Sequence, residues 1–192
     1  ENLEINEKTV VRDYVYDNKG DLIKTSLPYF KGENPKWIIR KFDGPGRLIF
    51  EELPDGATRT IAYNGLASTR TNELGQTTTV ISDIHGNNIE VIDNAGNSVT
   101  KKFDINSNVT EVNSNHPAIT FGYDLRNLVI RKVNPSSGIS TYRYNAFGEL
   151  IEKTTPNGKS IYRYDKLGRL IEQIDGNVTS NYLYDTKYIG KL

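Results

Sequence analysis

The residues that could carry chemistry in this chain are two histidines, a regular series of Asp and Asn residues, and 12 tyrosines. The chain has no Cys, which excludes thiol nucleophiles and Cys-based metal sites. His85 precedes a Gly and His116 precedes a Pro, so both stand in turn-like contexts far apart in the sequence. We interpret them as polar loop residues rather than as metal ligands or general bases. With no convergent set of catalytic groups, we expect neither an enzyme nor a metal or cofactor site.

The sequence pattern also disfavours phosphate binding by a glycine-rich loop and binding of nucleic acid. The run Gly44-Pro45-Gly46 is better explained as a turn than as a phosphate-binding loop. Twenty-four basic and 24 acidic residues give a net charge of zero without long runs of either sign, which argues against nucleic acid as a partner. No apolar stretch approaches the roughly 18 residues of a membrane span. Glu1 stands where an initiator Met is expected, so we expect an excised fragment whose targeting signal lies elsewhere.

The elements that would position these residues are β-strands. The chain has a mean hydropathy of −0.57 and is rich in Tyr and Gly, with 16 glycines, which is typical of short strands joined by many turns. It also repeats itself. An aromatic residue followed by Asp or Asn recurs at intervals of 26, 21, 19, 21, 20, 21, 20 and 20 residues, with a degenerate copy at Ser82. The repeat aromatics are Tyr16, Phe42, Tyr63, Phe103, Tyr123, Tyr144, Tyr164 and Tyr184.

The residues after each aromatic predict a hairpin turn. In the clearest copies an Asp is followed three residues later by Gly. The Asp side chain can bond the turn backbone, and Gly can adopt the left-handed conformation that ends a type I turn with a bulge. Calcium binding or acid chemistry by these carboxylates is the less favoured reading. The predicted turn residues are Asp17, Gly20, Asp43, Gly46, Asp165 and Gly168.

A second turn signal, such as Asp55-Gly56 or Asn157-Gly158, follows 12 to 15 residues after most motifs. Two turns in 20 residues leave two strands of about six residues, a usual length. The residue two before the motif aromatic is often aromatic as well, as in Tyr142 with Tyr144, so we expect an aromatic ladder on one face. Arg143 then lies on the opposite, wetter face. A sugar-stacking platform is the alternative reading of the ladder.

Irregular copies predict local departures. Ala67, Ser107 and Asn127 stand where Gly is expected, which predicts less regular turns there. Residues 27–37 contain two prolines and lengthen the first interval, so we expect an insertion loop, with Tyr29, Phe30 and Trp37 as possible ligand contacts. The whole chain, 1–192, is expected to be a single region of about nine repeats, with motifs at 16, 42, 63, 82, 103, 123, 144, 164 and 184.

These copies, such as Tyr164-Asp165-Lys166-Leu167-Gly168-Arg169-Leu170-Ile171, resemble the YD/Rhs repeat family along essentially the whole chain. Residues 27–37 and 42–48 look most similar to the Tc toxin B-component branch. The resemblance implies an all-β fold in which tandem antiparallel hairpins form a long curved sheet strip that spirals into a shell around a C-terminal toxin polypeptide. The closing segment of such a shell, with its protease aspartates, is not recognisable before Leu192.

The resulting expectation is a structural segment of a secreted bacterial toxin, without catalysis, whose partners are the rest of its own shell and the enclosed toxin domain. A Tc A-type translocator or a glycan is a further candidate partner. The alternative is a carbohydrate- or receptor-binding YD-repeat adhesion module on a secreted or cell-wall protein. We expect repeats without terminal caps to associate or dissolve poorly when isolated.

Overall fold

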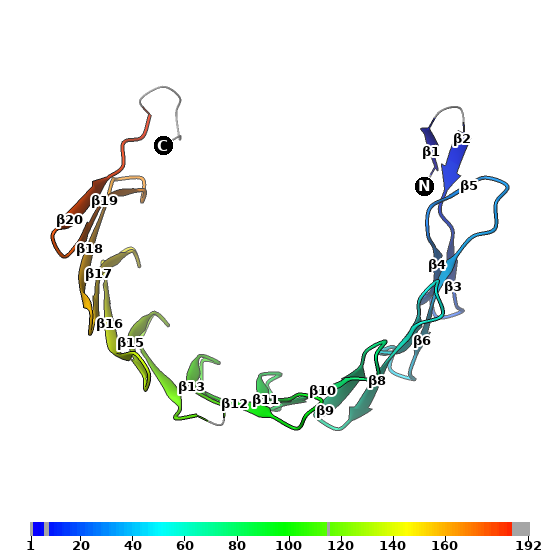
Figure 1. Ribbon diagram of the computed structural model, residues 1–192, viewed down its shortest axis with the longest axis horizontal. Helices are drawn as coiled ribbons and strands as arrows, with labels where there is room; N and C mark the ends of the chain where they lie inside the picture. Colours follow the sequence, from blue (N-terminus) through cyan, green and yellow to red (C-terminus); the bar gives the residue numbers. More distant parts are fainter. Residues whose placement is uncertain (1, 6–7, 115, 186–192) are drawn as a thin grey trace. The chain divides into compact units, whose positions relative to one another are not determined.

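The computed structural model describes residues 2–5, 8–114 and 116–185. All regular secondary structure in this part of the chain is β, and it contains no helix long and apolar enough to cross a membrane. The chain divides into two compact units, residues 1–98 and 99–192, and each is described by itself. Figure 1 shows single ribbons of strands in each unit, with no second layer packed on them.

Unit one contains a strip of antiparallel strands in which each strand pairs with the next one of the strip. The strip consists of β3 (Tyr14–Tyr16), β4 (Leu22–Ser26), β6 (Trp37–Phe42), β7 (Leu48–Glu52), β8 (Thr58–Asn64), β9 (Ala67–Thr71), β10 (Thr77–Ser82) and β11 (Asn88–Ile92). Short turns suffice to join neighbours because the strands run antiparallel.

Unit two is a strip of the same kind, and its strands also pair in sequence order. It consists of β12 (Ser98–Phe103), whose first residue belongs to unit one, β13 (Val109–Asn113), β14 (Ile119–Tyr123), β15 (Val129–Asn134), β16 (Gly138–Tyr144), β17 (Leu150–Thr155), β18 (Gly158–Tyr164), β19 (Leu170–Asp175) and β20 (Val178–Asn181). The all-β, tandem-hairpin fold expected from the sequence is therefore confirmed.

The segment 27–37 is not a loop throughout, contrary to the expectation from its two prolines. Tyr29–Phe30 form β5, which pairs with β2 (Lys8–Val11), and β2 pairs with β1 (Asn2–Ile5). The prolines are compatible with this strand because Pro28 precedes it and β5 is the edge of a three-stranded sheet. Trp37 opens β6 rather than closing a loop.

The junction between this small sheet and the strip is the most buried place in the described chain. Ser26 has no exposed surface and Thr25 is 4% exposed. The Ser26 hydroxyl accepts a hydrogen bond from the Asp13 amide at 2.8 Å, and the Ser26 amide donates to the Asp13 carbonyl at 2.9 Å. The buried polar groups of Ser26 are thereby satisfied, as burial requires.

A core of fully buried apolar side chains is missing from the described residues. A sheet one layer thick can cover its side chains only with their neighbours on the same face, so most apolar residues are half-buried. In β16 the side chains alternate, with half-buried Tyr142 and Tyr144 on either side of exposed Arg143. Stability must therefore come from contacts between adjacent strands and adjacent repeats.

A β-bulge follows the turn in seven of the eight described hairpins that carry a repeat motif, and the exception is the hairpin of Tyr63. Arg143 pairs with Glu152, but the next pair is Tyr144 with Leu150, so Ile151 has no partner across the ladder. Ile171 is left over in the same way between the pairs Arg163–Glu172 and Tyr164–Leu170. A bulge bends its strand and increases its twist. Its recurrence at most motifs introduces a repeated bend into each strip.

Candidate functional site: the Tyr-Asx turn network

The unit that repeats is a turn closed by both backbone and side-chain hydrogen bonds. At Asp165 the amide donates to the Arg169 carbonyl at 2.9 Å, and the Gly168 amide donates to the Asp165 carbonyl at 3.1 Å. The Asp165 carboxylate also accepts from the amides of Leu167 at 2.8 Å and Arg169 at 3.0 Å. The aspartate therefore satisfies turn amides, which is the role of an Asx turn.

The same closing pair of backbone hydrogen bonds recurs at nine Asx residues of the described chain. These turns begin at Asp17, Asp43, Asn72, Asp83, Asp93, Asp104, Asp124, Asn145 and Asp165. Asp17 with Gly20 and Asp43 with Gly46 thus stand at the first and fourth positions of their turns. The Asp43 carboxylate accepts only one turn amide, from Arg47, because Pro45 has no N–H.

The fourth position of the turn requires a left-handed backbone, and the chain meets this requirement in two ways. Gly168 has φ of 76° and Gly148 has φ of 84°. Ser107 and Asn127, with φ of 62° and 63°, adopt the same conformation without being Gly. Their turns keep the closing hydrogen bonds at 2.9 and 3.1 Å, so the expectation of irregular turns at these two residues was wrong. The hydrogen bonds of the Asx cap compensate for the steric cost.

Ala67 is not a turn residue, so the expectation that it occupies the Gly position of a turn was wrong. It is the first residue of β9 and pairs with Asn64, the last residue of β8, so only Gly65 and Leu66 connect the strands. Gly65 has φ of 58° at the first of the two central positions, as a type II′ turn requires. Asn64-Gly65 forms this shorter hairpin in place of the five-residue Asx turn.

In seven of the nine turns the residue four after the Asx forms a chemically complementary side-chain pair with it, the exceptions being Asp21 and Leu128. Where the Asx is Asp, the partner is a donor: Arg169 bonds Asp165 at 2.7 Å and Asn108 bonds Asp104 at 3.0 Å. Where the Asx is Asn, the partner is an acceptor, as when the Asn145 amide donates to Glu149 at 2.6 Å. The other pairs of this kind are Arg47 with Asp43, Asn87 with Asp83, Asn97 with Asp93 and Gln76 with Asn72.

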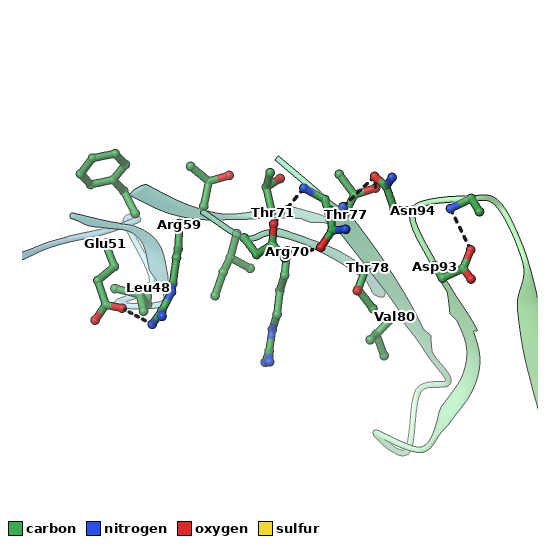
Figure 2. Close-up of a pocket in the computed structure, with 16 residues that line it drawn as sticks. Leu48, Glu51, Arg59, Arg70, Thr71, Thr77, Thr78, Val80, Asp93 and Asn94 are labelled. Atoms are coloured by element: carbon green, nitrogen blue, oxygen red, sulfur yellow. Dashed lines mark hydrogen bonds and ion pairs between the residues drawn. The ribbon is translucent and has the colours of Figure 1, made fainter. Parts of the chain in front are cut away.

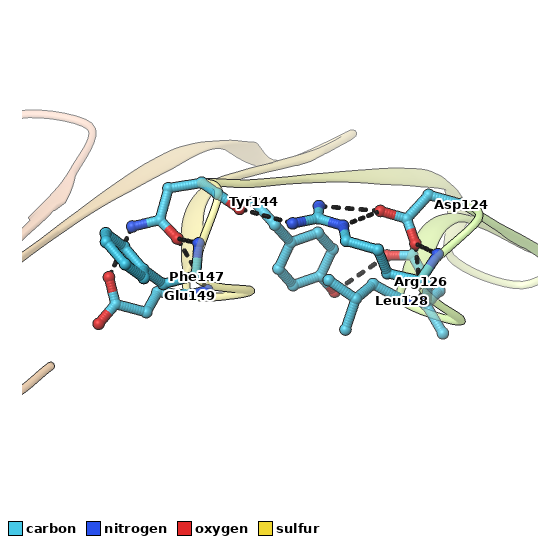
Figure 3. Close-up of polar contacts among 8 residues, drawn as sticks. Asp124, Arg126, Leu128, Tyr144, Phe147 and Glu149 are labelled. Carbon is cyan, nitrogen blue, oxygen red and sulfur yellow. Dashed lines mark hydrogen bonds and ion pairs between the residues drawn. The ribbon is translucent and has the colours of Figure 1, made fainter.

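In unit two, three motif tyrosines each connect their repeat to the repeat before it. The hydroxyl of Tyr123 donates to the Val109 carbonyl at 2.7 Å. The hydroxyls of Tyr144 and Tyr164 donate to the carbonyls of Val129 and Leu150, each at 3.0 Å. In all three cases the acceptor is the sixth residue after the previous motif aromatic, as Figure 3 shows for Tyr144. Tyr16 begins the series and is 58% exposed.

Arginine makes a second kind of connection between repeats. The Arg47 guanidinium lies 4.1 Å from the centre of the Tyr63 ring, and that of Arg169 lies 4.6 Å from the Tyr184 ring. Both arginines also bond the Asp of their own turn, Asp43 and Asp165. Arg126 instead donates to the Asn145 carbonyl at 2.8 Å (Figure 3). These contacts join successive turns of the strip.

These surroundings shift pKa values in two directions. Burial raises the pKa of Tyr144 and Tyr164, and nearby negative or phenolic groups add to the rise. The side-chain hydrogen bond from Asn108, with the backbone hydrogen bond of the same residue, lowers the pKa of Asp104. Hydrogen bonds to the ionised carboxylate favour its charged form. The raised pKa keeps the tyrosine hydroxyls protonated near neutral pH, and the lowered pKa keeps the aspartate ionised. Both directions are consistent with a structural role.

The face opposite the motif tyrosines in unit two carries cross-strand ion pairs. Arg143 bonds Glu152 at 3.2 Å, and Lys159 bonds the same carboxylate at 3.0 Å. Lys102 and Glu111 are paired at 3.0 Å in the same arrangement. The side chains of Arg143 and Lys102 are 70% and 71% exposed, so this face is open to solvent, as expected from the sequence.

A hollow of about 780 Å³ in unit one does not form a single enclosed site. Its lining residues belong to both faces of a one-layer sheet. In Figure 2, Thr71, Thr77 and Asn94 lie on one side of the ribbon, whereas Arg70 and Val80 lie on the other. A ligand cannot contact both groups at once through the sheet, so this hollow does not carry a binding site.

A smaller hollow of about 290 Å³ includes Tyr29 and Phe30 among its lining residues. The Tyr29 hydroxyl is already engaged by Asp13 at 2.5 Å, and this hydrogen bond raises the Tyr29 pKa. Trp37, expected to share a contact surface with them, does not line this hollow. The structure therefore brings Tyr29 and Phe30 together but leaves Trp37 out.

Groups suited to metal or acid-base chemistry do not converge in the described residues. No cluster of three or more His, Asp or Glu side chains there could hold a metal ion. The His85 amide donates to the Asp83 carboxylate as part of an Asx turn, and His116 is exposed. The fold and its network define a protein built from Tyr-Asx hairpin repeats, several of which are docked on the repeat before them.

Comparison with known proteins relates these repeats to a known family of repeats. Residues 123–160 and 144–179 match the RHS Repeat family model. The chain is 24% identical over 123 residues to the double-stranded DNA deaminase toxin A of Burkholderia cenocepacia (strain H111), covering 62% of this chain and 8% of that toxin. Residues 123–179 therefore carry repeats of the RHS type.

Solved structures of similar fold come from Tc toxins. The TcdB2-TccC3-Cdc42 crystal structure matches 92% of this chain and 11% of its own chain, with a TM-score of 0.75 and 17% identity. The Photorhabdus luminescens Tc holotoxin pore matches 91% and 11%, with a TM-score of 0.70 and 16% identity. The chain thus spans about a tenth of the length of the proteins it resembles.

Proposed function

We propose that this chain is a wall segment of an Rhs-type β-shell that encloses a toxin polypeptide. The observation that carries the proposal is the docking of the Tyr144 hydroxyl on the Val129 carbonyl, repeated at Tyr123 and Tyr164. Each repeat uses its predecessor as a support and can itself support the next. Such an array can be extended without a conventional core, which suits a wall.

The one-layer sheet supports the same function. With no fully buried apolar side chain among the described residues, neither face is committed to a second layer. The enclosed polypeptide would face one side, and solvent the other. The proposed role is structural, so catalysis belongs to another part of the toxin. By resemblance to the Tc structures, the protein is secreted, and its further partner is a Tc A-type translocator.

The test is protease protection, using the complete open reading frame that encodes this chain. A protein with an intact wall should yield a protected C-terminal polypeptide after limited trypsin treatment. Replacing Tyr123, Tyr144 and Tyr164 together with Ala should open the wall and expose that polypeptide to cleavage. The matched control replaces Tyr142, Tyr162 and Tyr182, each of which stands two residues before a motif tyrosine. Equal cleavage of wild-type and triple-motif proteins would contradict the proposal.

The second candidate is a binding module for carbohydrate or a surface receptor. It is favoured by the hollow at Tyr29 and Phe30, since aromatic side chains can stack on sugar rings. The test is a glycan array with the 192-residue chain, repeated with Phe30→Ala. Binding that is lost in this variant would support a module. Failure to bind any glycan would remove the carbohydrate form of this candidate.

A further inference from the structure

The first strand of the unit-one strip, β3, has a neighbour on one side only. Among the described residues it pairs with β4, whereas β4 and β6 to β10 each pair with a strand on either side. The side chains of β3 are open on both faces of the sheet: Tyr14 is 39% exposed, Val15 is 38% and Tyr16 is 58%. An edge strand of this kind offers unpaired backbone groups to another strand.

Tyr16 is the one motif aromatic that is exposed in the described part of the chain, since the other seven are half-buried. Five of these contact the repeat before them, by a hydroxyl–carbonyl hydrogen bond or by an arginine over the ring: Tyr63, Tyr123, Tyr144, Tyr164 and Tyr184. Tyr16 makes neither contact within the described residues, although the Asp17 carboxylate closes its turn like the later turns. The repeat that contains Tyr16 therefore lacks only a predecessor.

The backbone of β3 is arranged to accept a further strand. The Ser26 amide of β4 donates to the Asp13 carbonyl at 2.9 Å, so the backbone groups of Asp13 face β4. In an antiparallel pair these groups face alternately toward the partner and away from it. Those of Val15 therefore face β4, and the N–H and C=O of Tyr14 point to the open side. A strand on that side would meet both groups.

The small three-stranded sheet shows which segment reaches this open side. Only Arg12 and Asp13 separate β2 from β3, so β2 leads directly into β3. On one side these two strands are accompanied by β5 and β4, which pair with β2 and β3 in turn. On the other side β1 is antiparallel to β2, with Asn2 opposite Val11, the last residue of β2. The chain therefore enters β1 from the end of β2 that adjoins β3.

We propose that the open side of β3 is the docking site of the segment immediately upstream of β1, which pairs there as an antiparallel strand and ends a preceding repeat. This inference rests on the proposed wall function and names the neighbour that the wall supplies at this place. If the register of β1 with β2 continues, the third residue upstream of Glu1 lies opposite Val15. The small sheet is then an extension of three adjacent strands beyond the strip, rather than a cap that terminates it.

This pairing gives Tyr16 the role of the later motif tyrosines. The upstream strand would stand to β3 as β15 stands to β16, and the Tyr144 hydroxyl of β16 donates to a carbonyl of β15, that of Val129. The Tyr16 hydroxyl can donate to the upstream strand in the same way. In the 192-residue chain it has no such bond, so Tyr16→Phe should cost stability only in the complete protein.

Covalent connection selects this occupant. A second copy of the chain or an enclosed polypeptide could also add a strand to an open sheet edge. Either would compete with a segment that is tethered beside β3 through β1, and a short tether gives an effective concentration on the order of millimolar. The upstream segment also has its direction fixed, because β1 is antiparallel to β2 and β2 leads into β3.

The test is disulfide trapping in the protein encoded by the complete open reading frame, in a Cys-free background. Val15→Cys is combined in turn with Cys at each of the five residues upstream of Glu1. Because its backbone faces β4, Val15 is a non-hydrogen-bonded position toward the new strand, where opposite Cα atoms lie about 4.5 Å apart, within reach of a disulfide. Mild oxidation should bridge Val15→Cys to one upstream position. The adjacent positions point to the opposite face and should react at least about tenfold less.

Lys24→Cys with the same upstream positions is the matched control. Lys24 is exposed and lies opposite Val15 on β4, one strand further from the new strand. The Cα distance to that strand would be about 9.6 Å, twice the strand spacing, which is too long for a disulfide. Absence of any bridge to Val15→Cys would overturn the proposal. So would equal bridging at consecutive upstream positions, or a bridge between two copies through Val15→Cys.

Hydrogen exchange tests the same pairing without substitutions. The Tyr14 amide points away from β4, so it is protected only if a further strand accepts its hydrogen bond. In the complete protein it should exchange at least about tenfold more slowly than an unstructured amide, and fast exchange would overturn the inference. If the C-terminal polypeptide is nevertheless protected from trypsin, the wall function stands and only this pairing is wrong. If bridging occurs but that polypeptide is cleaved, the pairing is correct and the enclosing role is wrong.

Discussion

The hydroxyl of Tyr144 donates to the carbonyl oxygen of Val129 at 3.0 Å, across 15 residues and from one repeat to the repeat before it. Tyr123 and Tyr164 make the same contact one repeat earlier and one repeat later. The tyrosine of the motif is therefore an inter-repeat connector. The alternation of residues along the strand predicts only which face the tyrosine occupies, and does not reveal that it bonds the preceding repeat.

Removing this hydroxyl should destabilise the strip. Tyr144→Phe keeps the ring and deletes one part-buried hydrogen bond, so we expect the free energy of unfolding to fall by about 0.5–1.5 kcal/mol. Urea denaturation followed by circular dichroism measures the change. Tyr16→Phe is the matched control: Tyr16 is 58% exposed and precedes the other motifs, so its effect should be close to zero. Equal losses in the two variants would show that the inter-repeat hydrogen bond is not the cause.

Where an Asx pairs with the residue four later, exchanging the donor and acceptor residues together should preserve the pair and its contribution to stability. Asn145→Asp places a carboxylate against Glu149 and should destabilise unit two. Adding Glu149→Arg should restore stability, because the pair then has the chemistry of Asp165 with Arg169. Exposed pairs contribute about 0.2–1 kcal/mol, so the coupling should be of that size. A double-mutant cycle by thermal unfolding measures it, and additive effects would contradict this expectation.

The two non-glycine residues with left-handed backbones should respond differently to replacement by Gly. Ser107→Gly relieves the unfavourable conformation at φ 62° and should stabilise the chain by up to about 1 kcal/mol. Asn127→Gly should gain less, because Asn tolerates this conformation and its side chain accepts a hydrogen bond from Asn108 at 2.8 Å. Thermal unfolding midpoints rank the two. A larger gain at Asn127 would be inconsistent with this account.

Gly138 is restricted twice, by its backbone and by a neighbouring repeat. Its φ is 81°, and an added Cβ would lie 2.6 Å from Cγ of Pro156. Gly138→Ala should therefore cost more than Gly176→Ala, where φ is 57° and nothing lies within 4 Å of an added Cβ. Combining Gly138→Ala with Pro156→Ala should recover the steric part of the loss and leave the backbone part. Chemical denaturation of the four proteins separates the two contributions.

Acid should destabilise the Asx turns. Hydrogen bonds from Asn108 lower the pKa of Asp104 below its ordinary value of 3.8, and Asn87 and Asn97 do the same for Asp83 and Asp93. A lowered folded-state pKa contributes stability that is present above the unfolded pKa and is lost as pH falls through the folded value. Urea midpoints should thus decrease below about pH 4.

The matched variant for this pH dependence is Asp104→Asn, which keeps the Oδ1 acceptor for the Asn106 and Asn108 amides. It should lose some stability at neutral pH and show a shallower decline in acid. If its decline is as steep as that of the wild type, protonation of Asp104 is not among the causes.

The sequence determined the local structure, because turn chemistry is local. An Asx followed three residues later by Gly specifies the hydrogen bonds of a turn whatever surrounds it, and alternation specifies the two faces of a strand. The strip of paired hairpins followed from these signals at a regular interval. Residues 27–37 were the exception, since the pairing of β5 with β2 depends on a segment about 20 residues away that carries no motif.

Only the tertiary structure decided what the repeats do to one another. The acceptor of the Tyr144 hydroxyl is a backbone carbonyl, and backbone groups have no signature in a sequence. Ser107 and Asn127 form regular turns because hydrogen bonds offset their steric cost, a balance that residue type alone does not give. The motif turns of unit two come to lie on one edge of the strip only because antiparallel pairing folds the chain back on itself.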